Sequence, residues 1–427
     1  MKIQKTLIHA AFGLILMANA AGLHAQTALT WDDCVKEAST HNLDLLSAEQ
    51  SVKADEDSHA ASLGQFFPQI SFNASANRSG LGGLNDALNS PNYGQNASLS
   101  LNAKEDIFVL NDFISVDQSN AQLDIARAQL QQAKAQLSHD LKVDFYGLLY
   151  AQKQIDLLKT IVDRQKANMD LVDMNFKGGT DNKGSYLQAQ AAYEEAVFEL
   201  NQAHRSLRVS QKQLDQVLGR NPMEPVEVDG DFENPTLSDT LPDFSSLTLQ
   251  TPAHRQALAQ LHQAENQFAS SEADFLPTLQ ANASLSQGGW NFDETQPGWE
   301  AGLSLNFPLF TGGEHFFDMQ SAGESKKGLE DALRGSDLKT ESSLENAYAS
   351  YADAVEQTQV LQAQLTAAQT QEEIGKAEYL NGLLIFVNWN QLENALTSQQ
   401  KAMLSGLLNV ETSEANWELT QGKGVIP

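Results

Sequence analysis

Two periodicities alternate along this chain, and together they predict a mixture of strands and long helices. Apolar and polar residues alternate after Pro68, and the same alternation returns over 97–103, 279–286 and 299–306. A period of two is typical of a strand with one apolar face. The predicted apolar faces contain Ile, Leu, Phe, Trp and Ala, whereas the opposite faces consist almost entirely of Ser, Asn and Gln. Each run is about ten residues long, the length at which a tilted strand crosses a bilayer.

The segments between these strands have a helical period. Apolar and Ala residues recur at steps of three and four, and no proline interrupts 112–176 or 314–379. At 1.5 Å per residue, each segment would form a helix roughly 100 Å long. A globular core does not need such a helix, so the pattern favours a coiled coil or a helical tube. Glycine turns at Gly179 and Gly382 end the long helices, because glycine supplies positive φ at a helix C-terminus.

The chain repeats this plan twice. Pro68 corresponds to Pro277 at an offset of 209 residues, and Gly179 corresponds to Gly382 at an offset of 203. Gly219 and Gly422, also 203 apart, end the return helices predicted over 186–218 and 389–420. Each half therefore predicts helix, strand, loop, strand, long helix, tight turn and helix. The expected domains are a first repeat at 26–219, an irregular connector at 220–251, a second repeat at 252–422 and a tail at 423–427.

The first 25 residues have the features of a Sec-type signal peptide. Lys2 and Lys5 precede an apolar stretch over 7–21, and Leu23-His-Ala25 is a small-residue cleavage site. The segment is too short to be a membrane-spanning helix, and Gln26 is the expected mature start. Cys34 is the one cysteine, so no intramolecular disulfide can form, and we expect a small buried residue there.

The charge is strongly acidic. The whole chain carries −28, and removal of Lys2 and Lys5 leaves 25 basic against 55 acidic residues, a net charge of −30. A generic nucleic-acid binder needs basic patches that displace phosphate counterions, so this class is excluded. An acidic chain suits either simple solubility or an aqueous path that favours cations.

Membrane strands explain the alternating segments better than a half-buried soluble sheet. A signal peptide, very polar faces, and hairpins with polar loops at 80–95 and 287–298 support this interpretation. Since the smallest membrane barrels have eight strands and open edges are not tolerated in lipid, several chains would have to share one barrel. Aromatic residues near the strand ends are typical of interfacial girdles: Phe66, Phe67, Phe108, Trp290, Trp299, Phe307 and Phe310.

No catalytic constellation or cofactor motif is found. The segment from Gly179 to Ser185 has the glycine spacing of a phosphate loop, but Ser185 occupies the lysine position and the segment follows a helix. The histidines are scattered, and Asp229-Gly-Asp231 lacks the later ligands of a calcium loop. We expect neither an enzyme nor a bound metal.

These features together resemble the TolC family of outer-membrane channel proteins. The resemblance is carried by Ala60–Pro68 and Glu272–Pro277 before strands, by Phe307-Pro-Leu-Phe-Thr-Gly-Gly313 at a strand-to-helix junction, and by the turn at Tyr379-Leu-Asn-Gly382. It covers nearly the whole mature chain, from about Leu29 to Gly422.

The resemblance implies a mainly helical, TolC-like α/β barrel. Three chains would share a twelve-stranded barrel in the outer membrane of a Gram-negative bacterium and a helical tunnel in the periplasm. It implies a passive exit duct of a tripartite efflux or type I secretion system, which exports small molecules or polypeptides. A periplasmic adaptor and an inner-membrane pump of the RND, ABC or MFS type would be its partners. The residues expected to contact the adaptor lie at the helix tips: Gly178, Gly179, Thr180, Asn381, Gly382 and Leu383.

The chain departs from the family's pattern in two places. The first repeat lacks the Pro-Leu-Phe-x-Gly-Gly junction and has Lys104–Asn111 instead. Some family members constrict the tunnel with aspartates six and nine residues past the turn glycine, where this chain has Asn388 and Gln391. Neutral side chains at a constriction should bind cations weakly and should not titrate.

Two other classes compete with a channel. A periplasmic coiled-coil scaffold or adhesin without a pore explains the helices and the acidity, but it leaves four bilayer-length strands unexplained. A secreted enzyme lacks an assembled site. The sequence does not identify the cargo, the pump class or the mechanism of opening.

Overall fold

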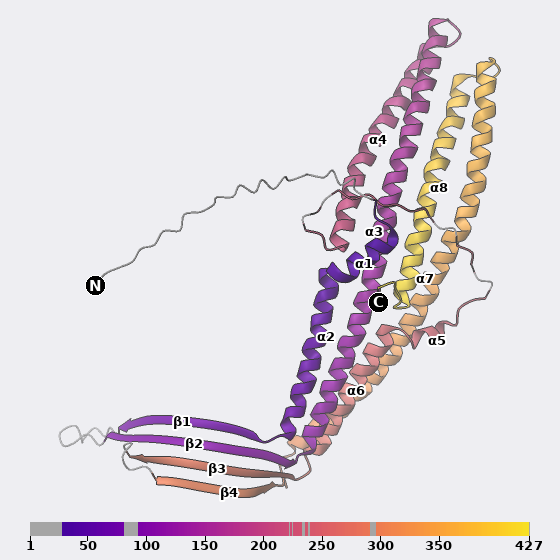
Figure 1. Cartoon of the computed structure of the whole chain (residues 1–427). Helices are drawn as coiled ribbons and strands as arrows, with labels where there is room; N and C mark the ends of the chain where they lie inside the picture. The colour runs from indigo at the N-terminus through magenta and orange to yellow at the C-terminus, as the bar shows by residue number, and fades with distance from the viewer. Residues whose placement is uncertain are drawn as a thin grey trace, which may run out of the picture.

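A long helical bundle and a small β-sheet at one end of it make up the molecule (Figure 1). This computed structural model describes residues 28–80, 93–221, 223, 225–232, 235–237, 240–290 and 296–426. The predicted signal peptide, most of the first hairpin loop and the side chain of Trp290 lie outside the described residues.

The two halves of the chain contain matching elements. The first half consists of α1 (Trp31–His41), α2 (Leu43–Ser62), η1 (Leu63–Phe66), β1 (Gln69–Gly80), β2 (Tyr93–Phe108), α3 (Leu110–Lys177) and α4 (Lys183–Val217). The second consists of α5 (Phe244–Thr248), α6 (Pro252–Ala273), β3 (Thr278–Trp290), β4 (Gln296–Asn306), α7 (Glu314–Leu380) and α8 (Phe386–Thr420). The long helices have 68 and 67 residues, and each return helix has 35. The predicted order of elements is therefore confirmed.

Several element bounds differ from those predicted. Strands β2, β3 and β4 extend into segments that we expected to be loops, so that the described hairpin ends are Gly80 and Tyr93 in the first repeat and Trp290 and Gln296 in the second. Each return helix begins three residues before its predicted start. In α4 the reason is an N-cap, because the side chain of Asn182 accepts a hydrogen bond from the Ser185 N–H at 3.0 Å.

The four strands form one antiparallel sheet in the order β1-β2-β3-β4. The register pairs apolar with apolar and polar with polar residues, for example Phe72 with Leu101 and Leu285 with Trp299. This confirms the predicted faces. Among the described strands, β1 and β4 are the edges, and the apolar face is open: Trp299 is 79 % exposed and Leu303 70 %.

The helices pack as two hairpins against each other. Helix α3 contacts α4 and α8 on the side of the helix tips, and it contacts α2 and α6 on the side of the sheet. Alanines at the α3–α4 seam, such as Ala196 and Ala203, allow close approach to Ile155, Leu158 and Ile161. The tips lie at the end of the bundle opposite the sheet (Figure 1).

The strand-to-helix junctions differ between the two repeats. In the first repeat β2 ends at Phe108 and α3 begins at Leu110, with only Val109 between them. In the second repeat β4 and α7 are separated by 307–313, which ends in Gly312 at φ 71° and Gly313 at φ 93°. The two junctions, which differ in sequence, therefore also differ in backbone conformation.

A core cluster at mid-height joins both ends of the described chain. Leu29 forms a parallel bridge with Val228 of the connector. The amide of Ile426 donates a hydrogen bond to the Ser138 hydroxyl of α3 at 3.1 Å. Val228 and Ile426 share this cluster with Cys34 and with Leu141 and Phe145 from the middle of α3. Cys34 is fully buried, as predicted. Burial raises the pKa of the Cys34 thiol to about 12, so the thiol is inert at neutral pH.

Candidate functional site

The two helix tips are built by the same turn. In each tip the glycine has positive φ, 78° at Gly179 and 72° at Gly382. The next residue closes the motif, because the Thr180 N–H donates to the Asn175 carbonyl at 2.9 Å and the Leu383 N–H donates to the Glu378 carbonyl at 2.9 Å. This pairing is a Schellman motif, which satisfies the last carbonyls of the helix. Both tips are consequently well-capped helix ends.

A tyrosine joins the two tips. The hydroxyl of Tyr379 on α7 accepts a hydrogen bond from the Asn175 side chain at 3.0 Å and donates to a carboxylate oxygen of Asp181 at 2.9 Å. Burial is the main reason that the pKa of Tyr379 is raised to about 12, so the phenol stays protonated. The α3–α4 tip and the α7–α8 tip are therefore connected through one side chain.

An aromatic pair occupies equivalent places in both hairpins. Phe176 stacks on Tyr186 with ring centroids 6.2 Å apart, and Tyr379 stacks on Trp389 at 4.7 Å. The members of the two pairs differ by the repeat offset of 203 residues. The second pair is buried with Phe386 in a cluster that also contains residues of α3 and α4. These aromatics therefore pack the two tips together.

A cavity of about 840 Å³ lies between the tips. Its lining comes from both turns and includes the predicted tip residues Gly179, Thr180, Asn381 and Gly382. Ile385, which also lines it, is 66 % exposed, and Leu383, which follows the lining residue Gly382 in the chain, is 79 % exposed. The tips thus present a hollow with a mixed polar and apolar lining, and two exposed apolar side chains, Leu383 and Ile385, belong to the same turn.

The predicted constriction residues lie one helical turn apart on α8. Asn388 and Gln391 are both exposed, whereas Trp389, Asn390 and Glu393 between and beyond them are buried. Residues three apart lie on the same side of a helix, so the two neutral side chains form one exposed polar stripe near the tip.

Below the tips, polar and charged contacts join α3 to α8. Arg164 of α3 forms an ion pair with Glu393 of α8 and donates hydrogen bonds to Thr397 at 2.9 Å and Gln400 at 3.1 Å. Nearer mid-height, Lys142 of α3 bonds to Glu414 of α8 at 2.6 Å. Below the tips, the α3–α8 seam thus contains charged contacts as well as apolar ones, unlike the apolar α3–α4 seam.

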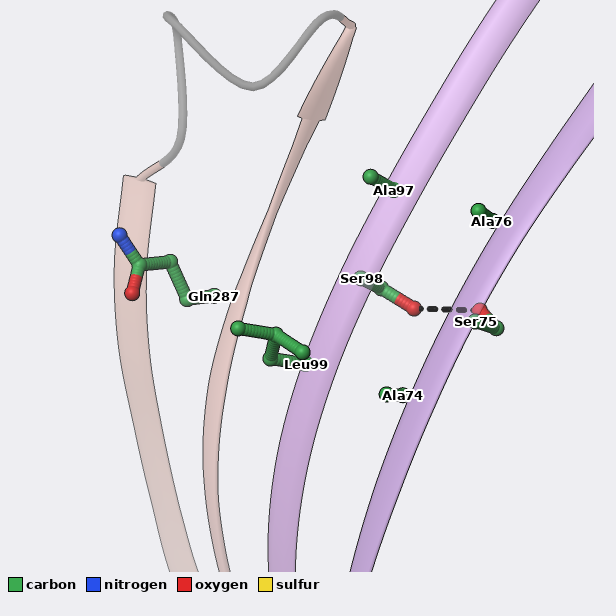
Figure 2. Close-up of a pocket in the computed structure, with 7 residues that line it drawn as sticks. All are labelled: Ala74, Ser75, Ala76, Ala97, Ser98, Leu99 and Gln287. Atoms are coloured by element: carbon green, nitrogen blue, oxygen red, sulfur yellow. Dashed lines mark hydrogen bonds between the residues drawn. The ribbon is translucent and has the colours of Figure 1, made fainter. Parts of the chain in front are cut away.

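The sheet places the predicted girdle residues at its two ends. Phe66, Phe67, Phe108, Phe307 and Phe310 lie at the end that continues into the helices, and Phe310 is 88 % exposed. Trp299 lies toward the hairpin end, where Trp290 is the last residue of β3. Figure 2 shows the polar face between them, where the hydroxyls of Ser75 and Ser98 point toward each other and form a hydrogen bond of 2.8 Å. The role of the aromatic residues as a membrane girdle stays a prediction.

Within the described ranges, no group of three or more His, Cys, Asp or Glu side chains could hold a metal ion. No helix in the same ranges is both long and apolar enough to span a membrane.

A long helical bundle with a small amphipathic sheet at one end is the fold of several solved outer-membrane channels. Three solved structures are similar. The outer-membrane channel OprN has a TM-score of 0.79 and is 18 % identical, and the match covers 93 % of this chain and 91 % of OprN. CusC has a TM-score of 0.82 and is 16 % identical, with 92 % of each chain covered. The CmeC channel of Campylobacter jejuni has a TM-score of 0.79 and is 16 % identical, with 99 % of this chain and 94 % of CmeC covered. A sequence comparison with curated proteins found no match.

The sequence itself matches the outer membrane efflux protein family over residues 34–220 and 245–421, so the chain belongs to that family. It is an outer-membrane exit duct of efflux systems in a Gram-negative bacterium, and its helical part lies in the periplasm. The competing scaffold interpretation is not favoured. The family and the similar structures are channels and not enzymes.

The sequence interpretation identified the turn that contains Tyr379, but it missed the contact of Tyr379 with the other tip and the charged cluster around Arg164. The pairs Phe176–Tyr186 and Tyr379–Trp389 recur at the repeat offset of 203 residues, and this recurrence could have indicated an aromatic contact at the tips. The ion pair gave no such signal, because Arg164 and Glu393 are 229 residues apart and no local pattern connects them.

Proposed function

We propose that the active form is a homotrimer in which three copies of the sheet close one twelve-stranded barrel. The observation that supports this most directly is the sheet itself, since β1 and β4 are edges among the described strands and its apolar face is exposed. Unpaired backbone groups are not tolerated in lipid, and four strands are too few to close a barrel. Three sheets of four strands satisfy both requirements.

The same assembly would place three pairs of hairpins around a periplasmic tunnel. Residues 26–219 and 252–422 would act as two structural repeats joined at mid-height by the connector 220–251. Asn388 and Gln391 would line the narrow end of the tunnel, which is consistent with their exposed positions on α8. Opening would require the α7–α8 hairpin to separate from the α3–α4 hairpin, because their tips are joined by Tyr379.

A periplasmic adaptor would dock on the helix tips, and an inner-membrane pump of the RND, ABC or MFS type would supply energy. The exposed Leu383 and Ile385 beside the cavity between the tips support a docking role. Transport through the duct itself would be passive, with small molecules or polypeptides as cargo. The net charge of −30 after signal removal would make the path modestly cation-selective.

Conductance of the purified protein tests this proposal. Mature protein in detergent should insert into a planar bilayer and give discrete, long-lived steps of uniform size. Chemical crosslinking of the same sample should give a trimer, and extraction from membranes should require detergent, not salt or urea. Folded material that never inserts, at any protein concentration, would contradict the channel proposal.

A further inference from the structure

A buried pair of carboxyl groups lies below the helix tips. Glu393 of α8 is 1 % exposed and Glu372 of α7 is 6 % exposed, and the two side chains face each other. One oxygen of Glu393 accepts from Arg164, and also from the Gln165 amide at 3.3 Å. The Glu372 carboxylate accepts from the Trp389 indole N–H at 3.1 Å.

The second oxygen of Glu393 has no donor among the described groups, although it is fully buried. A buried acceptor without a donor costs about 1–3 kcal/mol, and more when it is charged. The group that faces it is a second carboxyl, which cannot donate while it is ionised. One proton shared by the pair would supply the missing hydrogen bond.

The charges of the cluster support the same conclusion. Arg164 from α3 and Glu372 from α7 are the charged groups that face Glu393. Lys401 of α8 is engaged elsewhere, with Glu199 of α4 at 2.6 Å. With both carboxyls ionised the cluster would carry a buried charge of −1, whereas one proton makes it neutral. Burial, followed by the charge of Glu372, raises the pKa of Glu393 against the opposing effect of Arg164.

The first hairpin shows that this carboxyl pair is not required for packing a hairpin. At the repeat offset of 203 residues, Met169 corresponds to Glu372 and Gln190 corresponds to Glu393. The equivalent aromatic stack is kept in both hairpins, so the surrounding architecture is the same. At these two positions, the ionisable groups are present in the α7–α8 hairpin, which contacts Arg164, and absent from the α3–α4 hairpin.

We propose that Glu372 and Glu393 form a proton-binding site that locks the two hairpins together along the α3–α8 seam. The packed seam holds one proton on the pair. When the hairpins separate, Glu393 loses Arg164 and Gln165, water reaches both carboxyls, and the proton is released. This proposal rests on the proposed function only in taking hairpin separation as the opening step.

The sign of the pH dependence follows from linkage. In the separated state the carboxyls are hydrated and have an ordinary pKa of about 4.3. In the packed state the pKa of Glu393 is raised, so the packed state binds the proton more tightly. The lock is therefore complete below the ordinary pKa and is lost as pH rises through the raised pKa. Acid should hold the tips closed, and higher pH should favour separation.

The test measures the distance between the tips directly. Spin labels are placed on cysteines introduced at Met174 of α3 and Glu378 of α7, both exposed neighbours of the residues that join the tips. Native Cys34 is fully buried with a thiol pKa of about 12, so it does not take the label. Distances are recorded by pulsed electron paramagnetic resonance in detergent from about pH 4 to about pH 9, a range that brackets the ordinary carboxyl pKa.

The wild-type distance should be short in acid and should lengthen as pH rises. Glu393→Gln copies the protonated form, because its amide accepts from Arg164 and donates to Glu372, so its tips should stay close at every pH. Glu372→Gln should do the same and serves as a second variant if the first does not fold. Glu373→Gln, at an exposed neighbouring position, is the matched control and should follow the wild type.

A wild-type distance that does not change with pH would overturn the proposal, and so would a Glu393→Gln variant that opens like the wild type. Infrared spectra supply an independent readout, since a protonated-carboxyl band of the packed protein should disappear in Glu393→Gln. Neither readout depends on conductance. A protein that failed to conduct would contradict the channel proposal and leave this one standing.

Discussion

At the scale of single residues, the proposed position of Asn388 and Gln391 at the narrow end of the tunnel predicts how that end should treat ions. Amides offer dipoles to a passing cation, whereas carboxylates would offer full charges. Asn388→Asp is therefore expected to increase block by divalent cations. Each charge pair at 4 Å is worth about 1 kcal/mol in water, so a ring of carboxylates should tighten block by roughly tenfold or more.

Single-channel recording with added divalent cations measures this block. Asn409→Asp is a suitable control, because Asn409 is exposed on the same helix but far from the tip. No difference between Asn388→Asp and the wild type would remove this position from the pore.

Tyr379 is the second residue with a specific expected effect. Tyr379→Phe keeps the stack on Trp389 but removes the hydrogen bonds to Asn175 and Asp181. Two hydrogen bonds of this kind contribute about 1–3 kcal/mol. The open fraction of single channels should therefore rise by roughly tenfold, since 1.4 kcal/mol corresponds to a factor of ten. An unchanged open fraction would mean that this contact does not hold the tips closed.

The burial of a residue could be predicted only where neighbouring residues in the sequence indicate it. The burial of Cys34 could be predicted because it follows an N-cap in an amphipathic helix start, with Thr30 as the cap. Glu372 and Glu393 could not, because a glutamate on a polar helix is expected to face water. Their burial depends on the phase of two long helices relative to α3, and small changes of twist accumulate along such helices.

At the scale of elements, four glycines with positive φ end helices, but they differ in what surrounds them. A Cβ at Gly179 would meet no atom within 4 Å, whereas a Cβ at Gly219 would overlap the carbonyl group of His41. Gly179→Ala should cost about 1–2 kcal/mol, the strain of left-handed backbone alone. Gly219→Ala should cost clearly more, because backbone must also move. Denaturant unfolding in detergent measures both, and equal losses would contradict this difference.

Element types were more predictable than element ends. The apolar alternation identified all four described strands and both faces of the sheet, since one buried or lipid-facing side imposes the period. The strands nevertheless run into glycine- and asparagine-containing segments that we expected to be loops, such as the start of β2 at Tyr93. Pairing with a neighbouring strand extends a strand beyond its own periodic signal, and a local pattern cannot show this.

At the scale of the whole molecule, the mid-height cluster connects the chain's described ends to α3 and the connector. Ile426 is 6 % exposed in that cluster, although it is close to the end of the chain. Ile426→Ala should reduce the free energy of unfolding by about 2–5 kcal/mol, as for other buried large-to-small changes. Val425→Ala is the matched control, because Val425 is 44 % exposed. Equal stability of the two variants would show that the tail does not contribute to the core.

The overall plan was predictable because the repeat fixed it. Three landmarks at nearly constant offsets indicated two copies of one unit, and the elements follow that plan in both halves. The contact between the halves was not predictable, because it depends on side chains in which the repeats differ. Arg164, the main contact from α3, corresponds to Ala367 at the repeat offset.

The unequal strand-to-helix junctions have a mechanical consequence. Strand β2 and helix α3 meet at a sharp turn with only Val109 between them, so a displacement of either element should be passed to the other with little slack. Helix α7 instead joins its strand through a seven-residue link that ends in two glycines of positive φ. A link of this kind is compliant. The α7–α8 hairpin should therefore rotate about its junction with β4, while α3 stays fixed relative to the sheet. The helix tips could then move without displacing the strands in the membrane.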